Sequence, residues 1–81
     1  MEDFGLFIFG VYVGCNEREK RRNDGTIYTV YSYLLAIDDD AYKITSEFDY
    51  RSNLVFGDRV GFKIKVNAFN NQAYYHGTLI S

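Results

Sequence analysis

The chain has 81 residues and a formal net charge of −2, with one cysteine, one histidine and no proline or tryptophan. At this length we expect one domain, residues 1–81, with room for a small core but not for a deep substrate cavity as well. Cys15 alone excludes an internal disulfide and a cysteine-cluster zinc site, and His76 has no second imidazole with which to share a metal. Because the sequence has no secretory signal pattern and no 18-residue apolar run, we expect a cytoplasmic protein without membrane contact.

Charge is distributed unevenly along the chain. Residues 17–22 carry four bases and two acids, residues 38–49 carry five acids and one base, and residues 59–81 carry three bases and no acid. Such a molecule can present a basic face to a partner while remaining acidic overall.

Apolar and polar residues alternate with period two along most of the chain, which predicts β-strands. The first is expected at residues 4–15, where three glycines indicate bends or bulges in a strand that serves two sheets. A polar loop at 16–24 is expected to end in an Asp24-Gly25 turn, followed by a second strand at 26–37.

The third strand is expected at residues 41–48, with Tyr42, Ile44 and Phe48 on one face. Residues 49–58 are irregular, with room for one helical turn. The strand at 59–67 alternates clearly and predicts inward positions for Val60, Phe62, Ile64 and Val66. An Asn70-Asn71 turn then leads into a last strand at 72–80.

Five strands in a chain of this length favour closure, because a small barrel removes the exposed edges that an open sheet would present. The predicted fold is therefore all-β, a five-stranded OB-like barrel with a short irregular or helical connection between the third and fourth strands. An SH3-like barrel, with a similar strand count, is the structural alternative.

Catalytic and metal-binding patterns are weak. Nothing in the sequence orients His76 toward Cys15 as a nucleophilic pair, and consecutive carboxylates at Asp38, Asp39 and Asp40 diverge rather than surround a cation. We therefore expect neither an enzyme nor a protein that needs a cofactor or metal.

A binding surface is the more informative possibility. OB barrels bind ligands on strands two and three, assisted by the loops between strands one and two and between strands four and five. Cations for phosphates and flat rings for bases are what single-stranded nucleic acid requires. The candidate residues at these places are Arg18, Lys20, Arg21, Arg22, Tyr28, Tyr31, Tyr33, Lys43, Lys63, Lys65 and Phe69. Tyrosines also suit half-buried strands, and strand parity separates Tyr28 from the other two on its strand, so at least one of the three is expected to face inward.

Two segments carry a family resemblance. The runs 24–30 and 34–38 resemble the hairpin of the small single-stranded DNA-binding proteins of filamentous phages, in which a basic loop and a glycine precede a tyrosine. Residues 56–64 are similar to the entry into strand four of many OB folds, and residues 72–80 fit the last strand. The resemblance implies a homodimer that coats single strands without base preference, with contacts from Arg18, Arg21, Arg22, Tyr28 and Phe69.

The leading functional hypothesis is sequence-tolerant binding of single-stranded DNA in the replication or transfer of a phage or other mobile element. The alternative is a small inhibitor or interaction protein that binds a replication or host protein through residues 38–49 or an exposed aromatic patch. The acidic net charge and a first strand more apolar than the phage pattern motivate this alternative. The sequence leaves open whether DNA, RNA or protein is the partner.

Overall fold

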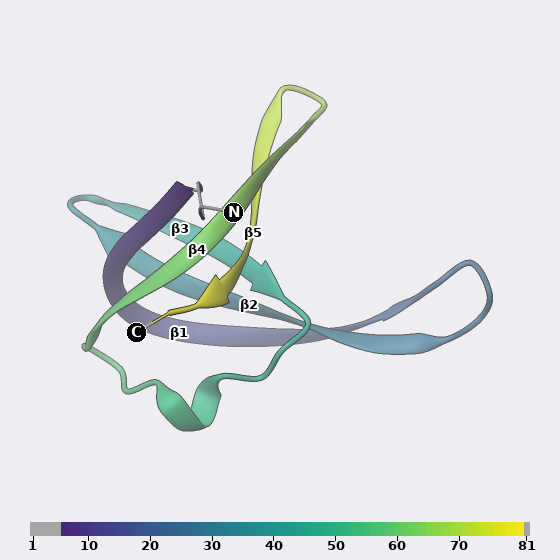
Figure 1. Ribbon diagram of the computed structural model, residues 1–81, viewed down its shortest axis with the longest axis horizontal. Coiled ribbons are helices and arrows are strands. Elements are labelled where there is room, and N and C mark those ends of the chain that lie inside the picture. Colours follow the sequence, from purple (N-terminus) through teal and green to yellow (C-terminus); the bar gives the residue numbers. More distant parts are fainter. Residues whose placement is uncertain (1–5, 81) are drawn as a thin grey trace, which may run out of the picture.

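Five strands and one 3-10 turn make up the chain in the computed structural model, which describes residues 6–80 except for the side chain of Phe69. The elements are β1 (Leu6–Arg21), β2 (Ile27–Ile37), β3 (Asp40–Ser46), the 3-10 turn Arg51–Asn53, β4 (Arg59–Phe69) and β5 (Gln72–Leu79) (Figure 1). The expected all-β class, strand number and short connection between the third and fourth strands are confirmed. Residues 4 and 5 of the expected first strand lie outside the described residues.

The strands close into a barrel in the order β1-β2-β3-β5-β4. All neighbouring pairs are antiparallel except β3 and β5, which run parallel over a short contact. The closed order leaves no free edge around the barrel itself, as expected for so short a chain. Among residues 6–80, no helix has the length and apolarity needed to cross a membrane.

β1 takes part in two pairings, because its first half pairs with β4 and its second half with β2. The register with β2 shifts just before Gly14, whose φ of 153° lies in a region that favours glycine. Closer to the start of β1, a Cβ on Gly10 would lie 2.8 Å from Cγ1 of Ile37 and 2.9 Å from the carbonyl oxygen of Ala36. Two of the glycines noted in the sequence thus allow the bend and the close strand contact.

The first hairpin extends much further than the sequence predicted. A loop was expected from residue 16, but β1 continues to Arg21 and pairs with the start of β2. The turn at its tip is tight, because Gly25 has a φ of 91° and the backbone N–H of Thr26 donates to Oδ1 of Asp24 at 2.9 Å. A tight turn holds the flanking segments in antiparallel register, so pairing continues up to it even through charged residues. The resulting two-stranded extension, residues 16–32, is called the arm (Figure 1).

The core lies inside the closed part of the barrel and consists of residues from β1, β2, β3 and β4. Its buried apolar members are Tyr12, Tyr33, Leu35, Ile44, Val60, Phe62 and Ile64. The inward position expected for Val66 is wrong, because β4 continues beyond the barrel into the β4–β5 hairpin and leaves Val66 43% exposed. Phe48, expected on one face with Tyr42 and Ile44, follows the end of β3 and is 64% exposed.

The Tyr33 side chain connects the core to the segment that follows β3. Its hydroxyl donates to the carbonyl oxygen of Phe48 and accepts from the backbone N–H of Tyr50 at 2.8 Å. The Tyr33 ring also packs against Tyr50 and Phe62, with centroids 5.7 and 5.5 Å away. One buried hydroxyl therefore satisfies two backbone groups of an otherwise irregular connection.

Replacing Tyr33 with Phe should lower the free energy of unfolding by about 1 to 3 kcal/mol, because it leaves the carbonyl of Phe48 and the N–H of Tyr50 without this partner. Tyr31→Phe is the matched control, since the Tyr31 hydroxyl has no hydrogen-bond partner within residues 6–80. Urea unfolding measures both effects. Equal effects of the two substitutions would contradict the role assigned to the Tyr33 hydroxyl.

The free energy of unfolding should also fall at alkaline pH, because the buried Tyr33 hydroxyl then loses its proton. Burial raises the pKa of Tyr33 to about 12 from its usual 10.0. The unfolded chain therefore loses this proton first, and the stabilisation present below pH 10 should be lost between about pH 10 and 12, by at most about 1.4 kcal/mol per pH unit. Unfolding curves for the wild type and Tyr33→Phe over this range should converge as the pH rises.

Candidate functional site

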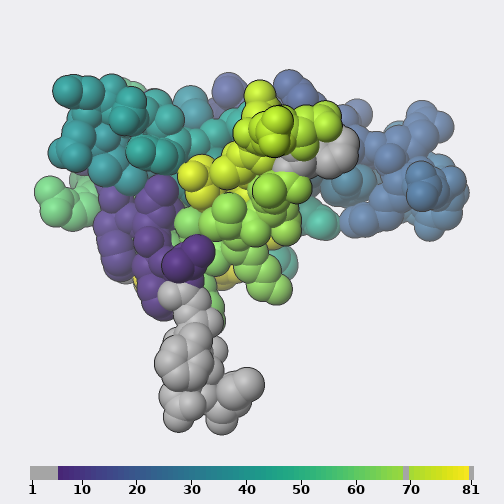
Figure 2. Space-filling view, turned by 90° about the horizontal axis from the view of Figure 1, so that it is seen from above, coloured from purple at the N-terminus to yellow at the C-terminus, as the bar shows by residue number. Residues whose placement is uncertain are grey.

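A groove of about 890 Å³ lies on the outer surface between the arm and the β4–β5 hairpin. In Figure 2 the hairpin (yellow-green) lies between the β2–β3 region (teal) and the arm (blue), which extends to the right. The groove is lined from four strands by Asn16, Glu17, Arg18, Lys20, Val30, Ser32, Ala41, Tyr42, Lys43, Thr45, Gln72, Ala73, Tyr74 and Tyr75. The groove therefore lies on the strands, β2 and β3, and beside the two hairpins that the sequence predicted for the ligand surface.

The arm places two predicted cations on the groove by strand geometry. Arg18 lies directly opposite Val30, and Lys20 directly opposite Tyr28, so these four side chains share one face of the ribbon. Arg21 has the opposite parity and is not among the groove residues. The structure therefore corrects the expected basic loop, because a strand with period two separates its bases between two faces.

Lys43 on β3 joins Arg18 and Lys20 in lining the groove. Glu17 also lines it, so three cations and one carboxylate come together there. Carboxylates also lie beside the cations of the arm, because Glu17 lines the groove and Glu47 contacts Arg22. Asp38, Asp39 and Asp40 do lie apart from the groove, at the β2–β3 turn.

Arg22 lies at the outer end of the arm between an aromatic ring and a carboxylate. Its Cζ is 4.0 Å from the ring centroid of Tyr28, and its Nη2 donates to Oε1 of Glu47 at 3.1 Å. The two charged side chains are 44% and 50% exposed. Solvent screens an ion pair of this exposure, so the contact is weak.

The three tyrosines predicted on β2 have different surroundings. Tyr33 is completely buried in the core, and a base has no access to its ring, so its expected stacking role is wrong. Tyr31 is half-buried against the core, and its ring centroid lies 5.1 Å from Cζ of Arg51. Tyr28 is half-buried under Arg22. The structure therefore leaves Tyr28 as the β2 ring on the same face as the groove cations.

The hairpin side of the groove contributes rings that were outside the predicted set. Tyr74 is 45% exposed, and its hydroxyl donates to Oε1 of Gln72 at 2.8 Å. Tyr42 and Tyr75 meet edge to face with centroids 6.2 Å apart, and both pack against the core. Tyr74 follows the Asn70-Asn71 turn by three residues. This position near a predicted hairpin tip was the sequence feature that could have identified its ring as part of the site.

The remaining predicted residues lie elsewhere. Lys63 and Lys65 are on β4 opposite Thr78 and His76 of β5, and neither lines the groove. Lys65 lies opposite His76, and Nδ1 of His76 is 3.3 Å from Oγ1 of Thr45, which lines the groove. The side chain of Phe69 lies outside the described part of the structure.

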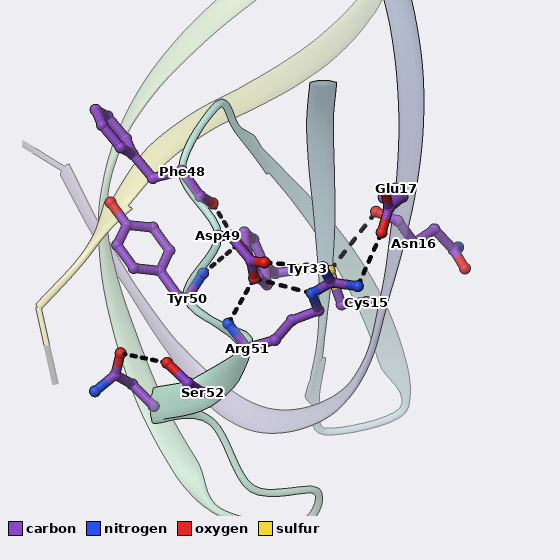
Figure 3. Close-up of polar contacts among 10 residues, drawn as sticks. Cys15, Asn16, Glu17, Tyr33, Phe48, Asp49, Tyr50, Arg51 and Ser52 are labelled. Carbon is purple, nitrogen blue, oxygen red and sulfur yellow. Dashed lines mark hydrogen bonds and ion pairs between the residues drawn. The ribbon is translucent and has the colours of Figure 1, made fainter. Parts of the chain in front are cut away.

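Arg51 is the most highly connected charged residue at the root of the arm (Figure 3). Its Nε and Nη2 donate to Oδ1 and Oδ2 of Asp49 at 2.9 and 2.8 Å, and its Nη1 donates to Oε1 of Glu17 at 2.9 Å. These bonds hold the pKa of Asp49 down at about 2 and raise that of Arg51. Sequence reasoning missed Arg51 because it lies in the irregular connection; the Asp-x-Arg spacing was the only local signal.

The two groups considered for catalysis show no activated nucleophile. Partial burial raises the pKa of the Cys15 thiol, which favours the protonated form. His76 contacts Thr45. Within residues 6–80, no three side chains of the types that bind metals come together.

No protein-family model matches the sequence, and a search of curated proteins found no match. Solved structures do match. The OB domain of a Thermoplasma acidophilum protein superposes with a TM-score of 0.65 and 22% identity, over 89% of this chain and 65% of that one. The second OB-fold domain of replication protein A from Methanococcus maripaludis superposes with a TM-score of 0.63 and 18% identity, over 93% and 79% of the two chains.

The chain has an OB fold. The strand order and these superpositions together decide against the SH3-like alternative. This chain spans 65% of the length of the Thermoplasma structure, so the OB barrel is the shared part. At these identities the likeness establishes the fold, and function has to be argued from the groove.

Arg51→Gln should return the pKa of Asp49 from about 2 toward its ordinary 3.8, because the bidentate pair that favours the carboxylate is lost. A carboxyl NMR titration measures this pKa directly. Arg22→Gln is the control, since Arg22 pairs with Glu47 rather than Asp49. A low Asp49 pKa that survives Arg51→Gln would contradict the contact shown in Figure 3.

Proposed function

We propose that the protein binds single-stranded nucleic acid, without sequence preference, along the groove between the arm and the β4–β5 hairpin. The observation that carries this proposal is the placement of Arg18, Lys20 and Lys43 on one groove whose opposite wall carries the exposed ring of Tyr74. Flexible cations neutralise phosphates and a flat ring stacks on any base, so this combination suits a strand whose bases are unpaired.

The composition of the groove supports binding without sequence preference. Stacking on a ring depends little on base identity. The groove also holds the short polar side chains Asn16, Ser32 and Thr45, which lie beside one another across β1, β2 and β3. Hydroxyl and amide groups can donate or accept, so they fit different base edges or the backbone.

The fold supports the same proposal. One superposing structure is an OB domain of a replication protein, and OB folds bind oligonucleotides and oligosaccharides on the corresponding strands and loops. Among these two ligand classes, the groove cations favour the anionic one.

More specifically, we propose DNA as the ligand and the replication or transfer of a phage or other mobile element as the setting, on the resemblance of residues 24–38 to the phage hairpin. A homodimer and the absence of enzymatic activity remain predictions. The alternative, a protein partner bound through residues 38–49, has less support, because Glu47 and Asp49 in this acidic segment already pair with Arg22 and Arg51.

Fluorescence anisotropy with labelled oligo-dT at several salt concentrations tests the proposal. With about three phosphates contacted, one for each groove cation, the logarithm of affinity should fall with the logarithm of salt concentration with a slope of about −2, because each single-strand contact contributes about −0.7. Arg18→Gln and Lys43→Gln should each weaken binding and reduce the slope by about 0.7. Arg59→Gln removes the same charge outside the groove and should have a smaller effect. Absent binding at low salt, or affinity indifferent to salt, would rule out the proposed function.

Tyr74→Ala should weaken oligo-dT binding by about 1 kcal/mol or more through lost stacking, with little change in the salt slope. Phe56→Ala is the matched control, because Phe56 is 73% exposed and lies outside the groove. The same titrations measure both variants. Equal affinities for Tyr74→Ala and Phe56→Ala would contradict the stacking role.

A further inference from the structure

Two arginines in this structure lie over tyrosine rings while also pairing with carboxylates. Arg22 lies over Tyr28 and pairs with Glu47, and Arg51 lies over Tyr31 and pairs with Asp49 and Glu17. Both arrangements hold a guanidinium on the surface near the groove. They differ in how firmly the guanidinium is held, and that difference bears on ligand binding.

Arg51 is firmly anchored. Three of its side-chain nitrogens donate to two carboxylates at 2.8 to 2.9 Å, and its backbone N–H donates to Asp49 as well. A bidentate guanidinium–carboxylate pair with a second acid is geometrically specific and costly to break. Arg51 is therefore a structural residue that ties the connection after β3 to the arm.

Arg22 is loosely held by comparison. One of its nitrogens donates to Glu47 at 3.1 Å, whereas three side-chain nitrogens of Arg51 donate, although the pairs of both arginines are similarly exposed. Exposed pairs of this kind contribute little net free energy, so another anion can replace the carboxylate at small cost. Phosphate is such an anion, because its oxygens accept from a guanidinium in the same geometry as a carboxylate.

Arg22 is not among the residues that line the groove, but it continues the line of Arg18 and Lys20 toward the tip of the arm. Residues 18, 20 and 22 have the same parity on the arm, and Tyr28 lies directly opposite Lys20 and beneath Arg22. A strand whose phosphates follow Arg18 and Lys20 toward the tip would meet Arg22 next. The Glu47 carboxylate pairs with Arg22 at that position.

We propose that Glu47 is a competing carboxylate, which a phosphate of the bound strand displaces from Arg22, and that it thereby limits affinity for the strand. This inference rests on the proposed function and adds a residue that weakens binding. A ligand with a single anionic group that binds Arg22 gains one contact but breaks the Arg22–Glu47 pair. A polyanion already bound to Arg18 and Lys20 is held next to Arg22, so the contact with Arg22 adds to contacts that it has made. Glu47 therefore favours long anionic strands over isolated anions.

The test compares Glu47→Gln with Glu19→Gln in oligo-dT anisotropy titrations at low salt. Both substitutions remove one negative charge from an exposed position near the arm, but Glu19 has no ion pair within residues 6–80. Glu47→Gln should tighten binding about two- to fivefold more than Glu19→Gln, which is the range expected for release of one exposed pair. In an Arg22→Gln background, the difference between the two substitutions should disappear.

The outcomes separate the two proposals. A Glu47→Gln variant that binds no tighter than Glu19→Gln, while the wild type binds oligo-dT, overturns the competing role and leaves the proposed function intact. An advantage of Glu47→Gln that persists in the Arg22→Gln background also overturns it, because the effect would then not pass through Arg22. If neither the wild type nor any variant binds oligo-dT at low salt, both proposals fail.

Discussion

The exchange of partners along β1 is the constraint on which the rest of the structure depends. Its first half closes the barrel against β4, and its second half leaves the barrel paired with β2. Two glycines permit this exchange. Gly10 lets β2 approach β1 closely, and Gly14 allows the register between the two strands to shift. Without the bend, residues 16–32 could not project from the barrel, and the groove would lose the wall that carries Arg18 and Lys20.

Electrostatics on the arm act at short range. The chain is acidic overall, and bases alternate with acids along residues 17–20, so Arg18 and Lys20 have acidic neighbours in the sequence. Side chains two residues apart share a face of a strand, which places Arg18 and Lys20 together, although Glu17 also lines the groove. Arg18 and Lys20 are thus directed to the groove, and Arg21 is not. Local geometry, rather than net charge, therefore determines where an anionic ligand could bind.

The connection after β3 links the core to the arm. In many proteins a segment without regular structure is mobile, but here the Tyr33 hydroxyl bonds to backbone groups of Phe48 and Tyr50. One residue further on, Arg51 reaches Glu17 on β1. The root of the arm is therefore braced from inside by a neutral hydrogen-bond network and from outside by an ionic one, while Arg22 near its outer end pairs with Glu47.

Period-two alternation and turn residues were sufficient to determine, from the sequence alone, an all-β chain of five strands with turns at Asp24-Gly25 and Asn70-Asn71. They also identified the inward residues Val60, Phe62 and Ile64, because the face on which a strand residue lies is a local property. How far a pairing extends is not local, so the sequence predicts a loop from residue 16 where β1 in fact continues to Arg21. Contacts between residues far apart along the chain, such as Arg22 with Glu47 and Arg51 with Glu17, leave no periodic signal. Only the tertiary structure decided these contacts, because closure of the barrel determines which distant segments meet. For the same reason, only the tertiary structure decided which cations lie on the groove.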